Sequence, residues 1–279
     1  MTTTIPTTSD HSLPRTTPLL CALGDSASAG VGDRMSGSTR SGMHDLPGCG
    51  WPVHLATALG VDVLNLGRNG ARARDVVATQ LPDALTARPD LATVLIGGND
   101  VLRGDFDIAE VGAALSGATT SLLDGGAQVV LVVPPQIAPD LPAPAAVRRV
   151  LGRRMEEVRA AAREVAAVHA HPDLVLVDAD PLRAAGRHVM HIDRIHPSPR
   201  GHRLMARLVA DRLLARGWPT RGEINAVPAP PGLAMQAAWL LVRGVPWLTR
   251  RSRDLLPELV RMVITEERAR RHQADVPTT

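Results

Sequence analysis

Ser26 and the segment 193–196 (DRIH) carry the residue types of a nucleophile and its general base. Ser26 directly follows a short apolar run and precedes the small, glycine-containing stretch 27–32, so we expect its hydroxyl at the end of a strand. Asp193 stands three residues before His196, close enough to accept a hydrogen bond from the imidazole Nδ1–H. Nε2 would then be free to take a proton from a serine. Each feature alone also fits an ordinary element: a helix N-cap for Ser26, a surface turn for the Asp–His pair.

Two further segments offer groups that could bind a developing negative charge. Residues 98–100 (GND) follow the third apolar run, and the amide of Asn99 is a neutral donor suited to an oxyanion. Residues 65–70 (NLGRNG) follow the second run, and glycine there lets a backbone N–H approach a ligand closely. Asn and Gly are also common in turns, so each segment alone is equally typical of a turn. Three neighbouring histidines compete for the role of base: His188, His191 and His202.

Five short apolar runs, separated by helix-like stretches, predict the elements that position these residues. The runs are apolar on both faces, which is typical of parallel strands buried between helices. The expected strands are residues 19–23, 61–66, 92–96, 129–133 and 174–177, and the expected helices are 51–59, 73–85, 108–123, 143–169 and 199–216. This alternation predicts a three-layer α/β/α sandwich with right-handed crossovers. Ligands of such a sheet sit beyond the carboxyl ends of the strands, where all four candidate segments fall.

Together, the four segments resemble the SGNH hydrolases, also called GDSL esterases and lipases. The matching segments are GDS at 24–26, NLGRNG at 65–70, GGND at 97–100 and DRIHP at 193–197, in that family's order. The resemblance implies a five-stranded parallel sheet of flavodoxin-like topology. It also implies a serine esterase that hydrolyses small-molecule acyl or acetyl esters through an acyl-enzyme, with no metal or organic cofactor.

By position, the resemblance assigns a role to each matching residue. Ser26 matches the family nucleophile, and Asp193 and His196 match its Asp-x-x-His pair. The implied oxyanion hole consists of the backbone N–H groups of Ser26 and Gly70 and the side chain of Asn99. Gly70 fits this role better than Gly67 by its distance from Asn65. The supporting motif residues are Gly24, Asp25 and Gly98, and Ala27 departs from the usual leucine at a position that serves packing.

Other functions remain open at this stage. The same residues would serve an acyltransferase that passes the acyl group to a sugar or alcohol, since access of water depends on packing. A non-catalytic binding module has no use for all four segments, and the chain lacks the GKS/GKT and complete glycine fingerprints of nucleotide sites. Five arginines near the expected site either hold an anionic part of the substrate or pair with acids: Arg34, Arg40, Arg68, Arg72 and Arg74.

Charge and composition exclude several classes of protein. The 279 residues are 44% hydrophobic and 21% charged, which is ordinary for a globular chain. The net charge of +3 falls entirely in residues 218–279, where nine arginines face six acids, so the main body offers no concentrated basic face for nucleic acid. Two cysteines make no disulfide framework, and Cys21 is expected to be a buried thiol within an apolar run.

The chain divides into three expected parts. Residues 1–17 are expected to be a disordered leader, 18–217 the hydrolase domain, and 218–279 a linker and an amphipathic helical extension. We expect a cytoplasmic protein, because the leader does not have the pattern of a signal peptide and no apolar run reaches the ~18 residues of a membrane span. Residues 233–271 are expected either to pack on the main body or on a second copy, or to bind a membrane surface.

Overall fold

The parallel β-sheet contains five strands whose side chains are apolar on both faces. The computed structural model describes residues 15–33, 50–141 and 143–224, together with positions 232, 234, 242, 261 and 263–265. The strands are β1 (Leu19–Gly24), β2 (Asp62–Asn65), β3 (Leu91–Leu95), β4 (Gln128–Val133) and β5 (Leu174–Asp178). Each lies within one residue of its expected bounds at either end. Strands β3 and β4 each begin one residue early.

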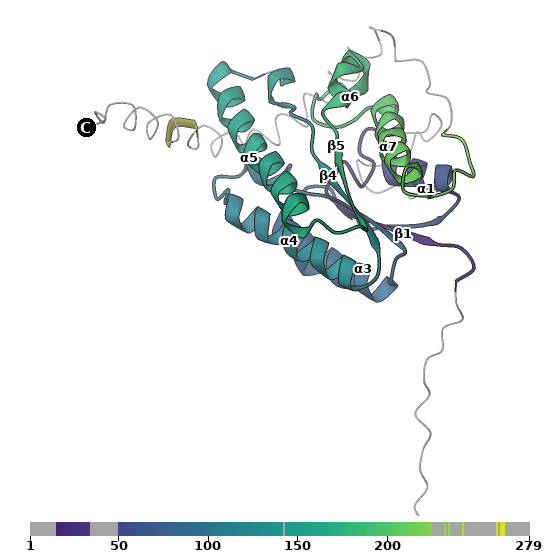
Figure 1. The fold of residues 1–279 in the computed structure, drawn as a ribbon. Coiled ribbons are helices and arrows are strands. Elements are labelled where there is room, and N and C mark those ends of the chain that lie inside the picture. Colours follow the sequence, from purple (N-terminus) through teal and green to yellow (C-terminus); the bar gives the residue numbers. More distant parts are fainter. Residues whose placement is uncertain are drawn as a thin grey trace, which may run out of the picture.

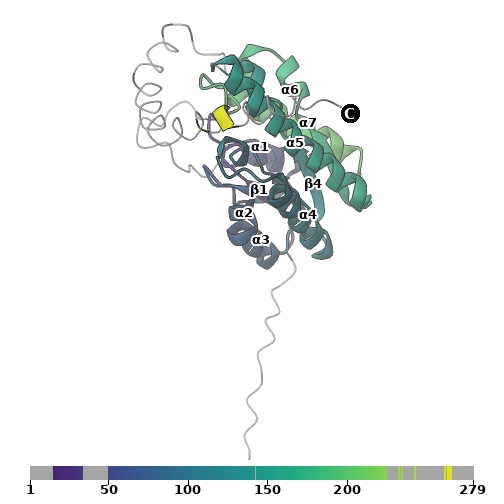
Figure 2. The same cartoon turned by 90° about the vertical axis from the view of Figure 1, so that its left-hand side faces the viewer.

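Helices cover both faces of this sheet, as predicted for a three-layer α/β/α sandwich. Both views place α1 and α7 across the strands from α3 and α4 (Figure 1, Figure 2). The main helices are α1 (Trp51–Leu59), α2 (Ala73–Asp75), α3 (Leu81–Ala87), α4 (Ile108–Asp124), α5 (Ala145–His169) and α7 (Pro199–Leu214). Two of these helices begin at a residue that caps the helix N-terminus. Asp107 caps α4 by accepting from Ala109 N–H, and Ser198 caps α7 by accepting from Gly201 N–H.

The strand order is β2-β1-β3-β4-β5, and all neighbouring pairs are parallel. The chain therefore moves from β1 outward in one direction to β2 and then returns to the other side of β1 with β3. In a sheet of this order, the crevice at the reversal point is where ligands bind. The loops after β1 and β3 flank that crevice, so the order itself brings Ser26 and Asn99 together.

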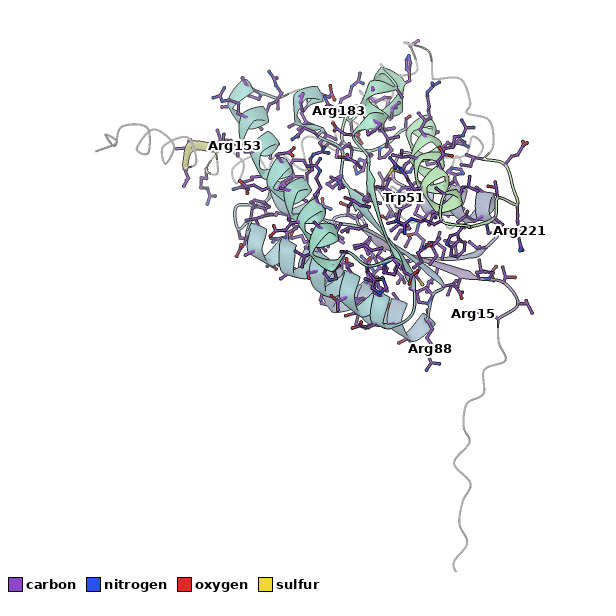
Figure 3. All side chains as sticks on the ribbon, viewed as in Figure 1. Arg15, Trp51, Arg88, Arg153, Arg183 and Arg221 are labelled. Carbon is purple, nitrogen blue, oxygen red and sulfur yellow. The ribbon has the colours of Figure 1, made fainter. Side chains whose placement is uncertain are left out.

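Two apolar cores lie between the sheet and its helices. One joins the strands to α3, α4 and α5, and the other joins them to α1 and α7. Trp51 is fully buried in the second core, and Figure 3 shows it in the interior, close to α7. Cys21 is also fully buried, and burial raises the pKa of its thiol to about 11. The expectation of a buried thiol is confirmed, and a thiol with a raised pKa is a poor nucleophile at neutral pH.

Three helices depart from their expected bounds for local reasons. The expected helix 73–85 is interrupted by a π-helical segment, η1 (Val76–Gln80), between α2 and α3. The helix expected from residue 143 begins as α5 two residues later, because Pro144 occupies its N-cap and disfavours helix at the residue before it. Helix α7 ends at Leu214, two residues early. The short segments α6 (Pro181–Ala184), η2 (Asp100–Leu102), η3 (Ala138–Asp140) and η4 (Arg187–Val189) were not predicted.

The expected leader and extension fall largely outside the described residues, which begin at Arg15 and become isolated positions after Ile224. Within the extension, Val263 packs against a small apolar cluster of Ala138, Val150 and Leu151. This is one contact of the kind expected if the extension packs on the main body. Among the helices that the structure describes, we find none with the length and apolar character needed to cross a bilayer.

Candidate active site

The carboxyl edge of the sheet brings Ser26, His196 and Asp193 into one hydrogen-bonded chain. Ser26 Oγ lies 2.9 Å from His196 Nε2, although the two residues are 170 positions apart. His196 Nδ1 lies 2.8 Å from Asp193 Oδ2. Because an ionised carboxylate only accepts hydrogen bonds, Nδ1 carries the proton and Nε2 is left to accept from the serine hydroxyl. A neutral imidazole in this tautomer is poised to take the Ser26 proton.

A tight loop after β5 fixes the Asp193 carboxylate. Its ends meet in an antiparallel bridge between Met190 and Pro197. Asp193 Oδ1 accepts the backbone N–H groups of Ile195 at 2.9 Å and His196 at 3.0 Å. Burial alone would raise the pKa of Asp193, but the hydrogen bonds from His191 and His196 outweigh it and hold the pKa well below its ordinary value. Asp193 is therefore a carboxylate at neutral pH.

The turn that presents Ser26 is anchored by Gln80, which sequence analysis missed. The Gln80 side chain is fully buried; its Oε1 accepts from Gly24 N–H at 2.8 Å, and its Nε2 donates to the Gly24 carbonyl at 2.9 Å. Strand β2 pairs with β1 only as far as Ala22; beyond it, Gly24 is held by the Gln80 amide and by the Arg68 N–H, which donates to the Gly24 carbonyl at 3.1 Å. The side chain of Asn65 adds a second anchor by donating to the Ser28 carbonyl at 2.7 Å.

Gly70 and Asn99 lie on the loops that follow the strands on either side of β1. Gly70 has φ +83°, a conformation that favours glycine, and no atom lies within 4 Å of the position of a Cβ there. Asn99 Nδ2 donates to the Ala71 carbonyl at 3.0 Å, which orients the amide beside the loop of Gly70. A Cβ at Gly67, by contrast, would lie 2.7 Å from Ala29 N, so that glycine serves packing.

Asp25 and Gly98 support the motifs through close packing. Asp25 is buried, and its Oδ1 accepts from Ala27 N–H at 2.9 Å. A Cβ at Gly98 would lie 3.0 Å from Asp25 Oδ2, so a larger residue would press on this carboxyl. Burial raises the pKa of Asp25 to about 6, against the opposing effects of the Ala27 hydrogen bond and of His196. The Asp25 carboxyl, which lies in the Ser26 turn, therefore titrates in mildly acidic solution.

Two of the five arginines expected near the site are engaged in ion pairs. Arg72 contacts the buried carboxylate of Asp100 at 3.2 Å and Asp105 at 2.9 Å. Arg74 contacts Asp105 at 3.1 Å and Glu110 at 2.7 Å. Arg72 and Arg74 therefore pair with acids, which was one of the two roles expected for the five arginines. Of the remaining three, Arg68 is exposed, and Arg34 and Arg40 lie outside the described residues.

A buried polar cluster holds the far end of the Ser26 loop. Asp33 Oδ2 accepts from Gly50 N–H at 2.9 Å and contacts His54 Nε2 at 2.7 Å, while Asp33 Oδ1 contacts Arg203 at 3.2 Å. Burial lowers the pKa of His202 to about 4, so this fully buried imidazole is neutral. Its Nδ1 accepts from Trp51 N–H and its Nε2 donates to the Val31 carbonyl. His202 is thus a structural residue and not a competing base.

Two more residues belong to the site: Arg154, which was not assigned a role from the sequence, and His191, which was considered only as a competing base. Arg154, on α5, is buried and donates to the carbonyls of Val101 and Arg103, holding the loop that follows Asn99. His191 Nδ1 lies 3.2 Å from Asp193 Oδ2, the oxygen that also contacts His196. The contact of Arg154 spans more than 50 positions, and no local pattern marks it. The His191-x-Asp193 spacing was a possible signal, but it is equally typical of an exposed turn.

A cavity of about 300 Å³ adjoins the loop that carries Asp193 and His196. It is lined by Asp140, Arg183, Gly186, Met190 and Arg194. Figure 3 shows Arg183 near α6, at the edge where β5 ends. A larger cavity of about 520 Å³ is lined mainly by residues of η3 and α5. Neither lining includes Ser26, His196 or Asp193. The smaller cavity is related to the site through Arg194, which lies between Asp193 and His196 in their loop.

The solved structures that this fold is similar to include two ester hydrolases. One is the lipase/acylhydrolase from Enterococcus faecalis, which is 21% identical with a TM-score of 0.56, over 75% of this chain and 100% of that one. Another is a catalytic mutant of Axe2, an acetylxylan esterase from Geobacillus stearothermophilus, which is 21% identical with a TM-score of 0.55, over 70% of this chain and 94% of that one. Likeness at this identity shows the fold alone. No match was found among curated proteins.

A family model assigns the chain to a protein family, which structures at about 21% identity cannot do. The model of the GDSL-like lipase/acylhydrolase family matches residues 22–204. This span covers more than half of the chain and includes the carboxyl half of β1, the strands β2 to β5, the Ser26 turn and the loop of Asp193 and His196. The chain therefore belongs to the GDSL-like lipase/acylhydrolase family of SGNH hydrolases, and it is a hydrolase of ester bonds.

Proposed function

We propose that the chain is a serine esterase that hydrolyses carboxylic esters of small molecules through an acyl-enzyme on Ser26. The observation that carries this proposal is the hydrogen-bonded chain from Ser26 Oγ through His196 to Asp193, at the carboxyl edge of the sheet. Catalytic mutants of Axe2 replace one serine, one aspartate and one histidine, the last two being three positions apart in that enzyme. Asp193 and His196 have the same spacing, which supports the same roles here.

In the first half of the reaction, Ser26 Oγ attacks the ester carbonyl carbon while its proton passes to His196 Nε2. Asp193 stabilises the imidazolium that forms. The tetrahedral intermediate collapses, the bond to the alcohol oxygen breaks, and His196 protonates the leaving alcohol. In the second half, water attacks the acyl-enzyme and gives a proton to His196, which returns it to Ser26 Oγ as the carboxylic acid leaves.

The negative charge on the carbonyl oxygen needs donors that are already in place. The Ser26 N–H, the Gly70 N–H and the Asn99 amide are the proposed oxyanion hole. The open space at Gly70 and the orientation of Asn99 by the Ala71 carbonyl support this assignment. An amide has two N–H groups, so Asn99 retains one for the oxyanion while the other holds the Ala71 carbonyl.

Replacing Asn99 by alanine is expected to lower kcat by about 100-fold or more, with little change in KM, because the lost donor acts in the transition state. The measurement is steady-state hydrolysis of a short p-nitrophenyl ester, with a thermal melt to verify folding. A folded Asn99→Ala protein with the wild-type kcat would exclude an oxyanion role for this residue.

The proposed activity is tested with p-nitrophenyl esters of rising acyl length and with a fluorophosphonate probe. We expect turnover of the shorter esters and covalent labelling of the Ser26 peptide, identified by mass spectrometry. Absence of both would overturn the proposal. Product analysis with a sugar or alcohol acceptor present separates hydrolysis from acyl transfer: free acid as the main product supports the esterase, and an acylated acceptor as the main product indicates an acyltransferase.

A further inference from the structure

The Asp193 carboxylate contacts a second imidazole besides that of His196. His196 Nδ1 lies 2.8 Å from Asp193 Oδ2, and His191 Nδ1 lies 3.2 Å from the same oxygen. The other oxygen, Oδ1, is occupied by two backbone N–H groups. Two ring nitrogens therefore share one carboxylate oxygen, and the proposed reaction needs only one of them.

The loop holds His191 in this position through its own backbone. His191 N–H donates to the His196 carbonyl at 2.8 Å, and Arg194 N–H donates to the His191 carbonyl at 3.0 Å. A Cβ at Gly32 would lie 3.6 Å from the His191 Cβ, so the loop that follows Ser26 packs directly against this side chain. The histidine is thus fixed between the two loops that supply the nucleophile and the base.

We propose that His191 is a positioning residue that holds the Asp193 carboxylate toward His196 by occupying the second side of the shared oxygen. This inference rests on the proposed esterase function. Asp193 keeps a side-chain exposure of 16%, so without His191 a water could take that side. A mobile water has to reorganise when His196 becomes charged, whereas an imidazole fixed at 3.2 Å from the oxygen does not. His191 would act on the chemical step through Asp193 and would not contact the substrate.

The proposal is tested with two substitutions at position 191. His191→Leu removes the polar contact with Asp193 Oδ2 and is expected to lower kcat about tenfold with KM unchanged. His191→Asn places an amide donor near the position of Nδ1 and is expected to restore kcat to within about twofold of wild type. In an Asp193→Asn background, His191→Leu is expected to have almost no further effect, because residues that act through one another are not additive.

The chain offers a matched control in His171 and Asp173. This pair has the same His-x-Asp spacing, with His171 Nδ1 at 3.9 Å from Asp173 Oδ2, but it precedes β5 and so lies at the opposite edge of the sheet. His171→Leu is expected to leave kcat unchanged. Thermal melts of all variants establish folding, and His191→Ala replaces His191→Leu, with the same expectations, if the leucine variant does not fold.

Three results would overturn the proposal: an unchanged kcat in folded His191→Leu, an equal fall in the leucine and asparagine variants, or a full additional loss in the Asp193→Asn background. Failure of the proposed function looks different. In that case the wild type has no activity that Ser26→Ala abolishes, whereas failure of this inference alone leaves Ser26-dependent turnover intact.

Discussion

Ser26→Ala is expected to lower kcat for short acyl esters by about 10⁴-fold or more while the fold is retained. The substitution removes the oxygen that attacks the carbonyl, and removal of a serine nucleophile has effects of at least this size in other serine hydrolases. The exposed fraction of Ser26 is only 7%, and alanine fills the same space without its hydroxyl. The measurement is hydrolysis of p-nitrophenyl acetate by purified protein, together with labelling by a fluorophosphonate.

Ser28→Ala is the matched control for this prediction. Ser28 is fully buried in the same turn, two residues further on, and its Oγ has no hydrogen-bond partner among the described residues. Ser28→Ala is expected to leave kcat within about twofold of wild type, because removal of this hydroxyl breaks no hydrogen bond. Wild-type turnover in folded Ser26→Ala protein would refute the assignment of the nucleophile.

Asp193→Asn is expected to lower kcat by about 10³- to 10⁴-fold through the wrong histidine tautomer. Two backbone N–H groups occupy Oδ1, so the asparagine oxygen must remain there and its NH₂ must take the place of Oδ2. The NH₂ then faces His196 Nδ1, and because an NH₂ group only donates, Nδ1 has to accept its hydrogen bond. Nε2 consequently carries the proton and cannot accept one from Ser26.

The tautomer is read by nitrogen NMR of labelled imidazole, and kcat is measured in parallel on the same preparation. Asp173→Asn provides the control, because Asp173 is an exposed carboxylate that lies near a histidine at the other edge of the sheet. Its kcat is expected to equal that of wild type. A fall of less than about tenfold in Asp193→Asn would argue against a role of Asp193 in holding the tautomer.

The strands and the candidate site could be predicted because each depends on short stretches of sequence. Five apolar runs identify buried parallel strands, and the residue after each run lies at the ligand-facing edge. Ser26 and Asn99 follow directly from this reasoning. The family resemblance added the choice of Gly70 over Gly67, and the packing of Gly67 against Ala29 is consistent with that choice.

The residues that sequence analysis missed act over long separations with side chains that look ordinary in their own element. Gln80 lies in a helix, 56 positions from its partner Gly24, and His202 lies in another helix, 151 positions from Trp51. Helical periodicity indicates which face of a helix is buried, but it does not reveal which backbone group a buried amide or imidazole will meet. The π-helical segment before α3 was missed for a similar reason, since its sequence is typical of an ordinary helix.

Gln80 has a consequence for how this sequence can change over time. Its amide supplies one donor and one acceptor to a single glycine, as a neighbouring strand would. Glutamate has nearly the same shape but offers only acceptors when ionised, so it would set a charge against the Gly24 carbonyl. Leucine would leave the Gly24 N–H without this acceptor, and the Gly24 carbonyl would keep only the Arg68 N–H. Position 80 is therefore open to very few substitutions, and the constraint comes from the end of a strand and not from the helix to which the residue belongs.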